Sequence, residues 1–296
     1  MKVGIIGTGI MGSNLARCLS SKGFRLGLFN RTKWRAERLA SEVGGRAYDT
    51  PYELIREVEA AIAFLPDDYA LMNVVHSIVS SGNYVYKGKF FINGSTVTPM
   101  ASLEVMGTLE RLGISYIEAP VYGSAEEARD CRLITLVACS EELFKNASIL
   151  LESYSSRIFY TGKPPSAIVL KLALNNIGLA MPALLSESLM LLESWNVDVE
   201  LFRRVASNLW FGAAIERIWG RIIEEQAPRF KVWMAGKDYW CIASALKEKK
   251  LPSLLSDALS SIYMVASTDG RYSNKDYPQV VNYYTKLARK AERSME

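Results

Sequence analysis

The sequence predicts an α/β protein in which a Rossmann-type, doubly wound sheet is followed by an all-α C-terminal domain. Up to about residue 160, short apolar runs alternate with segments of helical length, which is typical of a mostly parallel sheet. A Gly-x-Gly-x-x-Gly turn directly after the first apolar run supports the same fold. Around Gly162-Lys163-Pro164-Pro165 strand signals fade and helix-period segments take over. We therefore expect an NADP-binding domain at residues 1–162 and a helical substrate and oligomerisation domain at residues 163–296.

Apolar runs bounded by turn residues mark the strands of the first domain. We expect them at residues 3–6, 25–29, 60–65, 90–93, 115–118, 133–138 and 157–160. Helical segments are expected at residues 13–21, 33–43, 69–80, 98–112 and 141–152. The second domain should hold helices at residues 167–194, 199–208, 213–225, 237–247, 253–267 and 278–292. The helix at 167–194 is too long to be covered by a small domain, so we expect it to form the interface of a homodimer or homotetramer.

Composition describes a soluble globular chain of 296 residues, with 49% hydrophobic and 22% charged residues. The net charge of +4 is mild and spread along the chain, so we expect no nucleic-acid partner. The longest apolar stretch, residues 168–190, contains Lys171, Asn175 and Glu187, which favours a buried helix over a membrane span. Because Met1 leads straight into a core strand, no signal peptide is expected and a cytoplasmic location is favoured.

Cysteine and histidine usage argues against metal and disulfide frameworks. The four cysteines are Cys18, Cys131, Cys139 and Cys241, and no Cys-x-x-Cys occurs. The sole histidine, His76, cannot build a histidine cluster, so we expect a surface or packing role for it. The sequence therefore predicts neither a metal site nor a disulfide.

The most informative motif is Gly7-Thr8-Gly9-Ile10-Met11-Gly12, which joins an apolar strand to an amphipathic helix. In a dinucleotide-binding turn the first glycine permits the tight turn, the second lets the backbone approach the pyrophosphate, and the third lets helix pack on strand. The pyrophosphate then faces unpaired amides at a helix N-terminus. This context on both sides of the motif predicts dinucleotide binding rather than an ordinary loop.

The end of the second strand indicates which dinucleotide is bound. An acid normally accepts a hydrogen bond from the ribose 2′-hydroxyl of NAD at this place. Here the chain has Asn30, followed by Arg31, Thr32 and Lys33. A guanidinium group with nearby hydroxyl and amide donors suits a 2′-phosphate, so we expect NADP(H), although a solvated turn would have the same composition.

A nicotinamide enzyme needs a proton donor or acceptor beside the carbon that exchanges hydride. Lys171 lies in an apolar helical run just after the expected domain junction, and Asn175 follows on the same helix face. A lysine is charged at neutral pH, which suits protonation of a carbonyl oxygen during reduction. The pattern alone equally allows a lysine whose stem covers the core while its head reaches water.

Three further segments could line the site. Asn93-Gly94-Ser95-Thr96 follows a strand at its carboxyl end, where open α/β sheets place ligands. The run from Glu118 to Ser124 follows another strand and offers hydroxyls and amides for a carboxylate. Lys237-Asp238 opens a helix of the second domain. Helix caps, ordinary turns or a surface ion pair would explain each of these segments without a ligand.

Taken together, these motifs resemble the β-hydroxyacid dehydrogenases, the group that contains 3-hydroxyisobutyrate dehydrogenase. Within the group, the chain is most similar to the glyoxylate and succinic semialdehyde reductases, and the resemblance covers nearly the whole length. It implies that Lys171 is the general acid and that Asn175 orients it and the substrate. Further implied cofactor contacts are Leu65, Pro66, Thr96 and Lys237. The implied substrate contacts are Ser95, Tyr122, Gly123, Ser124, Phe230 and Asp238.

The chain departs from the pattern of this family at several positions. Tyr122 stands where the family usually has a serine that helps to bind the substrate carboxylate. Glu127 and Cys131 replace later glycines of the substrate loop, and Pro165 and Ala167 replace glycines before the lysine. These changes bear on which substrate the chain accepts.

The resulting expectation is an NADPH-dependent reductase of a small aldehyde acid, of the glyoxylate or succinic semialdehyde type. Hydride would reach the carbonyl carbon while Lys171 protonates the oxygen. One alternative is NADP-dependent oxidation of a 3-hydroxy acid, of the 3-hydroxyisobutyrate or serine type, by the same site. Another is a protein that binds NADPH without catalysis, for which Lys171 and Asn175 would have no chemical use.

Overall fold

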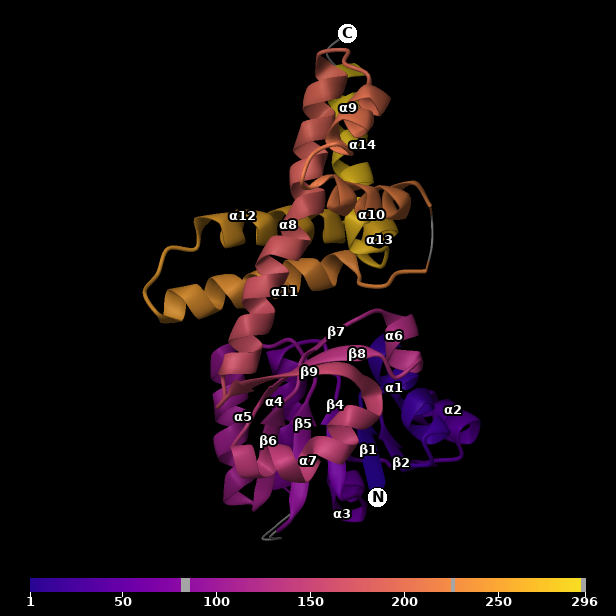
Figure 1. Ribbon diagram of the computed structural model, residues 1–296, viewed down its shortest axis with the longest axis vertical. Helices are drawn as coiled ribbons and strands as arrows, with labels where there is room; N and C mark the ends of the chain where they lie inside the picture. Colours follow the sequence, from indigo (N-terminus) through magenta and orange to yellow (C-terminus); the bar gives the residue numbers. More distant parts are fainter. Residues whose placement is uncertain (81–85, 225–226, 294–296) are drawn as a thin grey trace. The chain divides into compact units, whose positions relative to one another are not determined.

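The computed structural model describes residues 1–80, 86–224 and 227–293. The chain divides into two units, Met1–Leu172 and Ala173–Glu296, each of which is described by itself. The division falls inside helix α8 (Ser166–Ser194), whereas the expected boundary at residue 162 coincides with the end of the last strand. The ribbon in Figure 1 follows the chain from the strands of the first unit to the helices of the second.

Nine strands of the described chain form one sheet in the first unit. They are β1 (Lys2–Ile6), β2 (Arg25–Phe29), β3 (Arg46–Ala47), β4 (Ala60–Ala63), β5 (Lys89–Asn93), β6 (Ile114–Glu118), β7 (Val121–Tyr122), β8 (Leu133–Ala138) and β9 (Ser155–Gly162). Their order is β3-β2-β1-β4-β5-β6-β8-β7, with β9 paired to β8. Strands β1 to β6 pair in parallel, while β8 runs antiparallel to β6 and β7. The predicted doubly wound sheet is confirmed, and its order reverses between β1 and β4, where such sheets bind ligands.

Helices connect these strands. They are α1 (Ile10–Ser21), α2 (Lys33–Val43), α3 (Pro51–Glu57), α4 (Asp68–Val79), α5 (Pro99–Arg111), α6 (Ala125–Arg129) and α7 (Glu141–Tyr154). The sequence interpretation omitted β3, β7, α3 and α6. Each of these elements has seven residues or fewer, which is too short for hydrophobic periodicity to emerge. A local signal does exist for α3, because Thr50 caps it by accepting from the Glu53 amide and Pro51 occupies its first turn.

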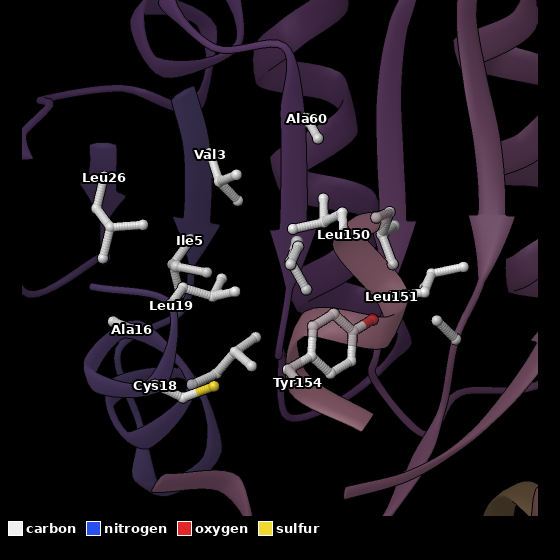
Figure 2. Close-up of a cluster of buried hydrophobic side chains, with 14 of the residues drawn as sticks. Val3, Ile5, Ala16, Cys18, Leu19, Leu26, Ala60, Leu150, Leu151 and Tyr154 are labelled. Atoms are coloured by element: carbon white, nitrogen blue, oxygen red, sulfur yellow. The ribbon is translucent and has the colours of Figure 1, made fainter. Parts of the chain in front are cut away.

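The core of the first unit lies between the sheet and its helices. Figure 2 shows Val3 and Ile5 of β1 together with Leu150, Leu151 and Tyr154 of α7, all of them buried. Strand β1 is almost continuously buried, as expected for a parallel strand covered on both faces. Burial of these apolar side chains anchors α1 and α7 on the sheet.

The second unit is built of helices, as expected. After α8 these are α9 (Val199–Ala206), α10 (Gly212–Ile223), α11 (Val232–Glu248), α12 (Leu254–Thr268), α13 (Gly270–Ser273), the 3₁₀ turn Tyr277–Gln279 and α14 (Val280–Arg293). Two buried tyrosines fasten α8 to its neighbours: the Tyr239 hydroxyl of α11 donates to the carbonyl of Asn176 at 2.8 Å, and that of Tyr263 in α12 donates to Leu179 at 2.7 Å. The expected end of one helix at Glu225 lies outside the described residues.

Helix α8 is the one helix of the described chain that is long and apolar enough to cross a membrane by length and composition alone. Its most apolar 18-residue window has a mean hydropathy of 1.7, and 44% of that window is buried in the protein. Ile177, Leu184 and Leu191 remain exposed at 72%, 59% and 62%. Core helices of soluble proteins can be equally long and apolar, so the feature of α8 that needs explanation is its exposed apolar stripe.

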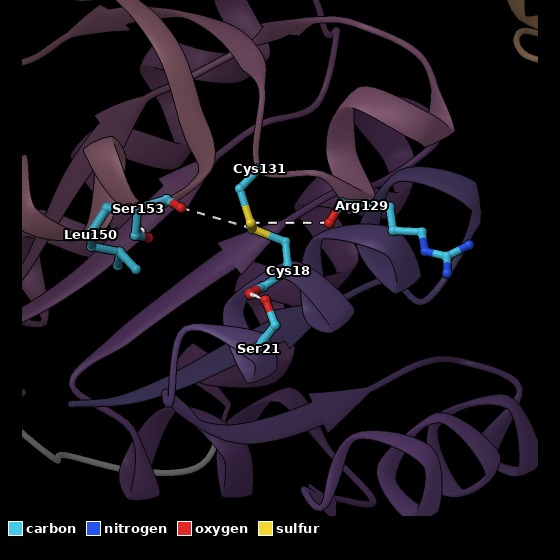
Figure 3. The surroundings of a disulfide bond; sticks show 6 residues. All are labelled: Cys18, Ser21, Arg129, Cys131, Leu150 and Ser153. Atoms are coloured by element: carbon cyan, nitrogen blue, oxygen red, sulfur yellow. Dashed lines mark hydrogen bonds between the residues drawn. A yellow bond between two sulfur atoms is a disulfide. The ribbon is translucent and has the colours of Figure 1, made fainter.

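The expectation that the cysteines form no disulfide is wrong. Cys18 in α1 is bonded to Cys131, which follows α6, with their Cα atoms 5.4 Å apart (Figure 3). The two residues are 113 positions apart, and only the packing of α6 against α1 brings them together. Sequence spacing carries no such information. Cys131 also has a φ of +58°, a left-handed conformation that favours glycine, at one of the positions where the family pattern has one.

The remaining cysteines lie in the interior, and the histidine lies at the surface. Cys139 and Cys241 are buried and form no disulfide, and His76 is exposed near the end of α4. Within residues 1–80, 86–224 and 227–293, no group of three or more His, Cys, Asp or Glu side chains is placed to hold a metal ion.

Candidate active site

The turn between β1 and α1 is shaped by three glycines with different duties. A Cβ at Gly7, where φ is +92°, would lie 2.2 Å from the Phe64 carbonyl oxygen, and one at Gly12 would lie 1.9 Å from the Gly7 carbonyl oxygen. A Cβ at Gly9 would meet nothing within 4 Å. The fold itself therefore requires the outer two glycines, whereas Gly9 borders open space at the N-terminus of a helix.

The residues between the glycines suit a phosphate group. Gly9 is the N-cap of α1 and offers no side chain to the first amides, and no acidic residue stands in the first turn. The Thr8 hydroxyl is buried and has no hydrogen-bond partner among the described residues. Ile10 and Met11 are half-buried, and Met11 packs against the core. Free amides, a helix dipole and an orphaned hydroxyl together fit the pyrophosphate of a dinucleotide.

At the end of β2, Asn30 braces the turn. Its Oδ1 accepts from the Thr8 amide at 3.1 Å, and its Nδ2 donates to the Thr32 carbonyl at 3.1 Å. Lys33 is drawn away by an ion pair with Asp49 at 2.5 Å. Arg31 is exposed, and Thr32 is the N-cap of α2 without a hydrogen bond from its own side chain to the helix. Arg31 and Thr32 are thus the side chains of this segment best placed to meet a phosphate.

The loops after β4 and β5 are tied together by Ser95. Its buried hydroxyl accepts from the Leu65 amide at 2.9 Å and donates to the Ala63 carbonyl at 3.3 Å. Thr96 is half-buried beside it, and Pro66 is exposed on the neighbouring loop. The structure brings these expected residues together because β4 and β5 are adjacent in the sheet.

The loop after β7 turns at Gly123 and starts a short helix at Ser124. Gly123 has a φ of +141°, and a Cβ there would lie 2.7 Å from Leu133. Ser124 and Glu127 form a capping box, in which the Glu127 carboxylate accepts from the amide and the hydroxyl of Ser124. The departure from glycine at Glu127 therefore has a structural role, and the Ser124 hydroxyl serves as a helix cap.

Tyr122 is the residue that departs most from the family pattern, and it contacts Lys171 twice. Its hydroxyl donates to the Lys171 carbonyl at 3.1 Å, and the centroid of its ring lies 3.4 Å from the Lys171 Nζ. Lys171 is only 8% exposed. A ring face this close to an ammonium group is a favourable cation–π contact. Tyr122 therefore supports the lysine instead of directing its hydroxyl at a ligand.

In the second unit, Asp238 of α11 is the centre of a buried polar cluster. Its Oδ2 accepts from the Asn175 amide at 2.7 Å, and its Oδ1 pairs with the Lys237 Nζ at 2.5 Å. The Asp238 side chain is 1% exposed, so this is not the surface ion pair that the sequence allowed. The acid orients the amide of Asn175, which lies one helical turn after Lys171 on the unbroken helix α8.

Phe230 is held in a separate cluster of the same unit. Its amide donates to Asp276 at 3.0 Å, and Asp276 also pairs with Arg221 at 2.8 Å. The ring packs edge-on against Tyr277 with centroids 6.0 Å apart. The structure thus fixes Phe230 just before α11, beside Asp276 and Tyr277.

One site residue was missed as such by sequence reasoning. Glu118, at the end of β6, is fully buried and accepts from the Ile168 amide in the first turn of α8 at 3.2 Å. An acid that ends an otherwise apolar strand was the available signal. The sequence interpretation used Glu118 only as the first residue of the substrate loop.

The chain matches known proteins over nearly its whole length. Residues 2–162 match the family model described as the NAD binding domain of 6-phosphogluconate dehydrogenase. An uncharacterized oxidoreductase of Bacillus subtilis, YfjR, is 30% identical over 80% of this chain and 84% of its own. Glyoxylate/succinic semialdehyde reductase 1 of Arabidopsis thaliana is 32% identical over 64% of this chain and 66% of its own. Mitochondrial 3-hydroxyisobutyrate dehydrogenase of Mus musculus is 26% identical over 95% of this chain and 86% of its own.

Solved structures show the same fold. A 3-hydroxyisobutyrate dehydrogenase of Mycobacterium tuberculosis with L-serine superposes with a TM-score of 0.82, at 19% identity over 95% of this chain and 98% of that one. Psf3 in complex with NADP⁺ and 2-OPP superposes with a TM-score of 0.77, at 20% identity over 95% and 99% of the two chains. At these identities the structural comparison concerns the fold.

The glycine turn yields a matched pair of variants. Gly9→Ala should fold with an unchanged melting temperature, because its Cβ meets no protein atom, yet weaken dinucleotide binding about tenfold or more. Gly12→Ala should lower the free energy of unfolding by about 1–3 kcal/mol, because its Cβ collides with the Gly7 carbonyl. Thermal melts and cofactor titration measure both effects. Wild-type affinity in Gly9→Ala would show that the turn does not cradle the pyrophosphate.

Proposed function

This chain belongs to the β-hydroxyacid dehydrogenase family, and from that premise we propose that it reduces a small aldehyde acid with NADPH. The family assignment makes it a pyridine-nucleotide-dependent oxidoreductase that acts on hydroxyl or carbonyl groups. The proposed substrate is of the glyoxylate or succinic semialdehyde type, in line with the plant relatives. The observation that carries the proposal is Lys171, a buried cation held against the ring of Tyr122.

The proposed chemistry divides between cofactor and protein. The bound nicotinamide would supply the hydride that the carbonyl carbon receives. Lys171 would give a proton from Nζ to the carbonyl oxygen, and the face of the Tyr122 ring lies against that Nζ. Asn175, fixed by Asp238, would orient the reacting oxygen. The Tyr122 hydroxyl is committed to a backbone carbonyl, and the amide and hydroxyl of Ser124 are committed to Glu127. The backbone at Gly123 is therefore the part of this loop that we propose for the substrate carboxylate.

The preference for NADPH over NADH is part of the proposal. Its support is the absence of an acid at Asn30, which braces the glycine turn, together with the exposed guanidinium of Arg31 and the hydroxyl of Thr32. These donors suit a 2′-phosphate, whereas NAD recognition normally uses a carboxylate at this strand end.

A second candidate is the reverse reaction, NADP-dependent oxidation of a 3-hydroxy acid. The relatives named 3-hydroxyisobutyrate dehydrogenase favour it, since they match 95% of this chain. Initial rates in both directions over a panel of aldehyde acids and 3-hydroxy acids separate the two candidates. Faster reduction than oxidation at matched saturation supports the reductase.

Lys171→Ala should lower kcat by about 100-fold or more, because it removes the proton donor. NADPH affinity should stay within about twofold of wild type, since this lysine is not among the proposed cofactor contacts. Stopped-flow turnover and fluorescence titration measure the two quantities. Wild-type kcat in this variant would refute the assignment.

Tyr122→Phe is the matched control for that experiment. It keeps the ring over the ammonium group and removes only the hydroxyl that donates to the Lys171 carbonyl. We expect kcat and KM within about threefold of wild type, the effect of one neutral hydrogen bond. A KM for the acid that rises tenfold or more would mean that the hydroxyl binds the carboxylate instead.

Arg31→Ala should weaken NADPH binding by about 10- to 100-fold and leave NADH binding unchanged, because it removes a charge-assisted hydrogen bond to the 2′-phosphate. Arg157→Ala, at another exposed arginine on β9, serves as the control for net charge. Titration with both cofactors decides the point. An unchanged ratio of the two affinities, or equal binding of NADH by the wild-type protein, contradicts the proposed preference.

We also propose that α8 packs against a second copy of the chain. Ile177, Leu184 and Leu191 recur at the seven-residue period of a self-associating helix and are all exposed. Sedimentation should give about twice the chain mass of 33.0 kDa, or a higher multiple, and Ile177→Asp should shift the protein towards monomer. Ile149→Asp, with a similar 74% exposure in α7, is the control. A monomeric wild-type protein at micromolar concentration contradicts the proposal.

A further inference from the structure

Glu118 is a buried carboxyl group that grips the start of the helix bearing Lys171. It ends β6 and is 0% exposed. The Ser102 hydroxyl of α5 donates to its Oε1 at 2.5 Å, and the Ile168 amide of α8 donates to its Oε2 at 3.2 Å. The Ala167 amide also donates to the carboxyl group. Lys171 follows Ile168 by three residues, which is less than one turn of the helix.

The first turn of a helix leaves amides without partners, and a side chain just before the helix usually accepts from them. In α8 the hydrogen-bond acceptor for these amides is Glu118, which lies on a strand 50 positions earlier in the sequence. The first turn of α8 contains no acid of its own. A carboxyl group buried in apolar surroundings is costly, so its placement here needs a reason beyond packing.

We propose that Glu118 is a positioning residue for Lys171, fixing through the first turn of α8 where the helix delivers the ammonium group. The inference rests on the proposed role of Lys171 as general acid. Glu118 acts on the lysine only through the Ala167 and Ile168 amides and is not itself a proton donor to the substrate.

The carboxyl group belongs to a longer buried chain of hydrogen bonds. Ser102 also contacts the Tyr116 hydroxyl at 2.8 Å, and that hydroxyl accepts from Asn93 at 3.0 Å. The Asn93 Oδ1 in turn accepts from the Ser95 amide at 3.0 Å. One network therefore connects the loop that holds Ser95 to the helix that holds the lysine, so that a cofactor loop and the proton donor share one rigid support.

The protonation state of Glu118 changes in the working range of an enzyme. Burial raises the pKa of its carboxyl group to about 7, while the bonds from Ser102, Ile168 and Ala167 act in the opposite direction. The neighbours on the other elements are an uncharged tyrosine, Tyr116, with a pKa raised by burial, and the thiol of Cys139 beside the paired β8 residue, with a pKa raised to about 11. Lys171 is the basic residue on α8 itself.

This titration distinguishes positioning from simple capping. A charged carboxylate accepts from the amides more strongly than a neutral carboxyl group or a carboxamide does. The hydrogen bonds between Glu118 and the first turn of α8 should therefore become stronger as the pH rises through about 7. If Glu118 only completed the helix, the stronger bonds of the carboxylate would change the stability of the protein, but the kcat profiles of wild type and Glu118→Gln would stay parallel at every pH.

The test compares Glu118→Gln with wild type and with Glu152→Gln, an exposed acid on α7, between pH 5.5 and pH 8.5 on the proposed substrate. Wild type and Glu118→Gln should have similar kcat near pH 6, and the variant should fall roughly tenfold behind by pH 8. KM and NADPH affinity should stay within about twofold. Parallel kcat profiles in the two proteins would overturn the proposal.

Ser102→Ala covers the case in which Glu118→Gln does not fold. The Ser102 hydroxyl lowers the pKa of the Glu118 carboxyl group, so its loss should move the step in kcat to higher pH without abolishing it. A step that stays in place overturns the proposal, since the step would then belong to another group.

A readout that needs no turnover separates this inference from the proposed function. Because the pKa of Glu118 is raised on folding, the native protein holds a proton that the unfolded chain has lost between about pH 4.5 and pH 7. As the pH rises from about 4.5 to about 7, the stability of the wild-type protein should therefore fall relative to that of Glu118→Gln. Denaturant midpoints at several pH values measure this difference. If this pH dependence of stability is found but Lys171→Ala keeps wild-type kcat, the proposed function is refuted, while the raised pKa of the buried Glu118 is supported. If Lys171→Ala is inactive and Glu118→Gln has the wild-type pH profile, only the positioning role fails.

Discussion

The first unit depends on one close approach, that of the α1 backbone to the end of β1. Gly12 lies so near the Gly7 carbonyl that a single methyl group would collide with it. This approach lays α1 along the sheet, where it meets α7 in the buried cluster of Figure 2 and also contacts α6. Contact with α6 brings Cys131 to Cys18, so the disulfide of Figure 3 is a consequence of the same packing. At Gly9, by contrast, a Cβ would meet no protein atom within 4 Å, so the turn borders open space there.

The sequence was most informative where a signal was local and long, although α11 begins at Val232, five residues before its predicted start. Helix α2 begins and ends where its periodicity predicts, and the parallel sheet follows from the alternation of apolar runs with helical segments. Short elements such as β3 and α6 were not predicted, because two to five residues are too few to show a hydrophobic periodicity. The disulfide escaped because its partners meet only in three dimensions. The residues of the candidate site were predictable from the sequence. Their hydrogen-bond and ion-pair partners were not, because these partners lie on strands and helices that are distant in sequence.

For several side chains, the hydrogen-bond partners in the structure indicate a role different from the one that the sequence suggested. The sequence pointed to Asn30 for its place near the ribose. In the structure both polar atoms of its side chain form hydrogen bonds within the turn. Ser124, considered as a ligand for a carboxylate, caps α6 with Glu127. Asn93, Ser95 and Glu118 end or follow neighbouring strands, so the sheet order assembles them into one buried network although they are far apart in the chain. In each case the residue type was a sound guide to the chemistry and a poor guide to the partner.

The start of α8 is held from two directions, and this gives the substitution at Tyr122 a physical meaning. Glu118 binds amides at the head of the helix, while the Tyr122 hydroxyl binds the Lys171 carbonyl about one turn further on. The ring of the same tyrosine covers the ammonium group. A serine could not span the distance to that carbonyl and also present an apolar face to the cation. With Pro165 and Ala167 in place of two glycines, the segment before Lys171 also has less backbone freedom to lose. The departures from the family pattern at Tyr122, Pro165 and Ala167 therefore all act on the short segment that bears the lysine, and the tyrosine ring occupies the space beside its ammonium group.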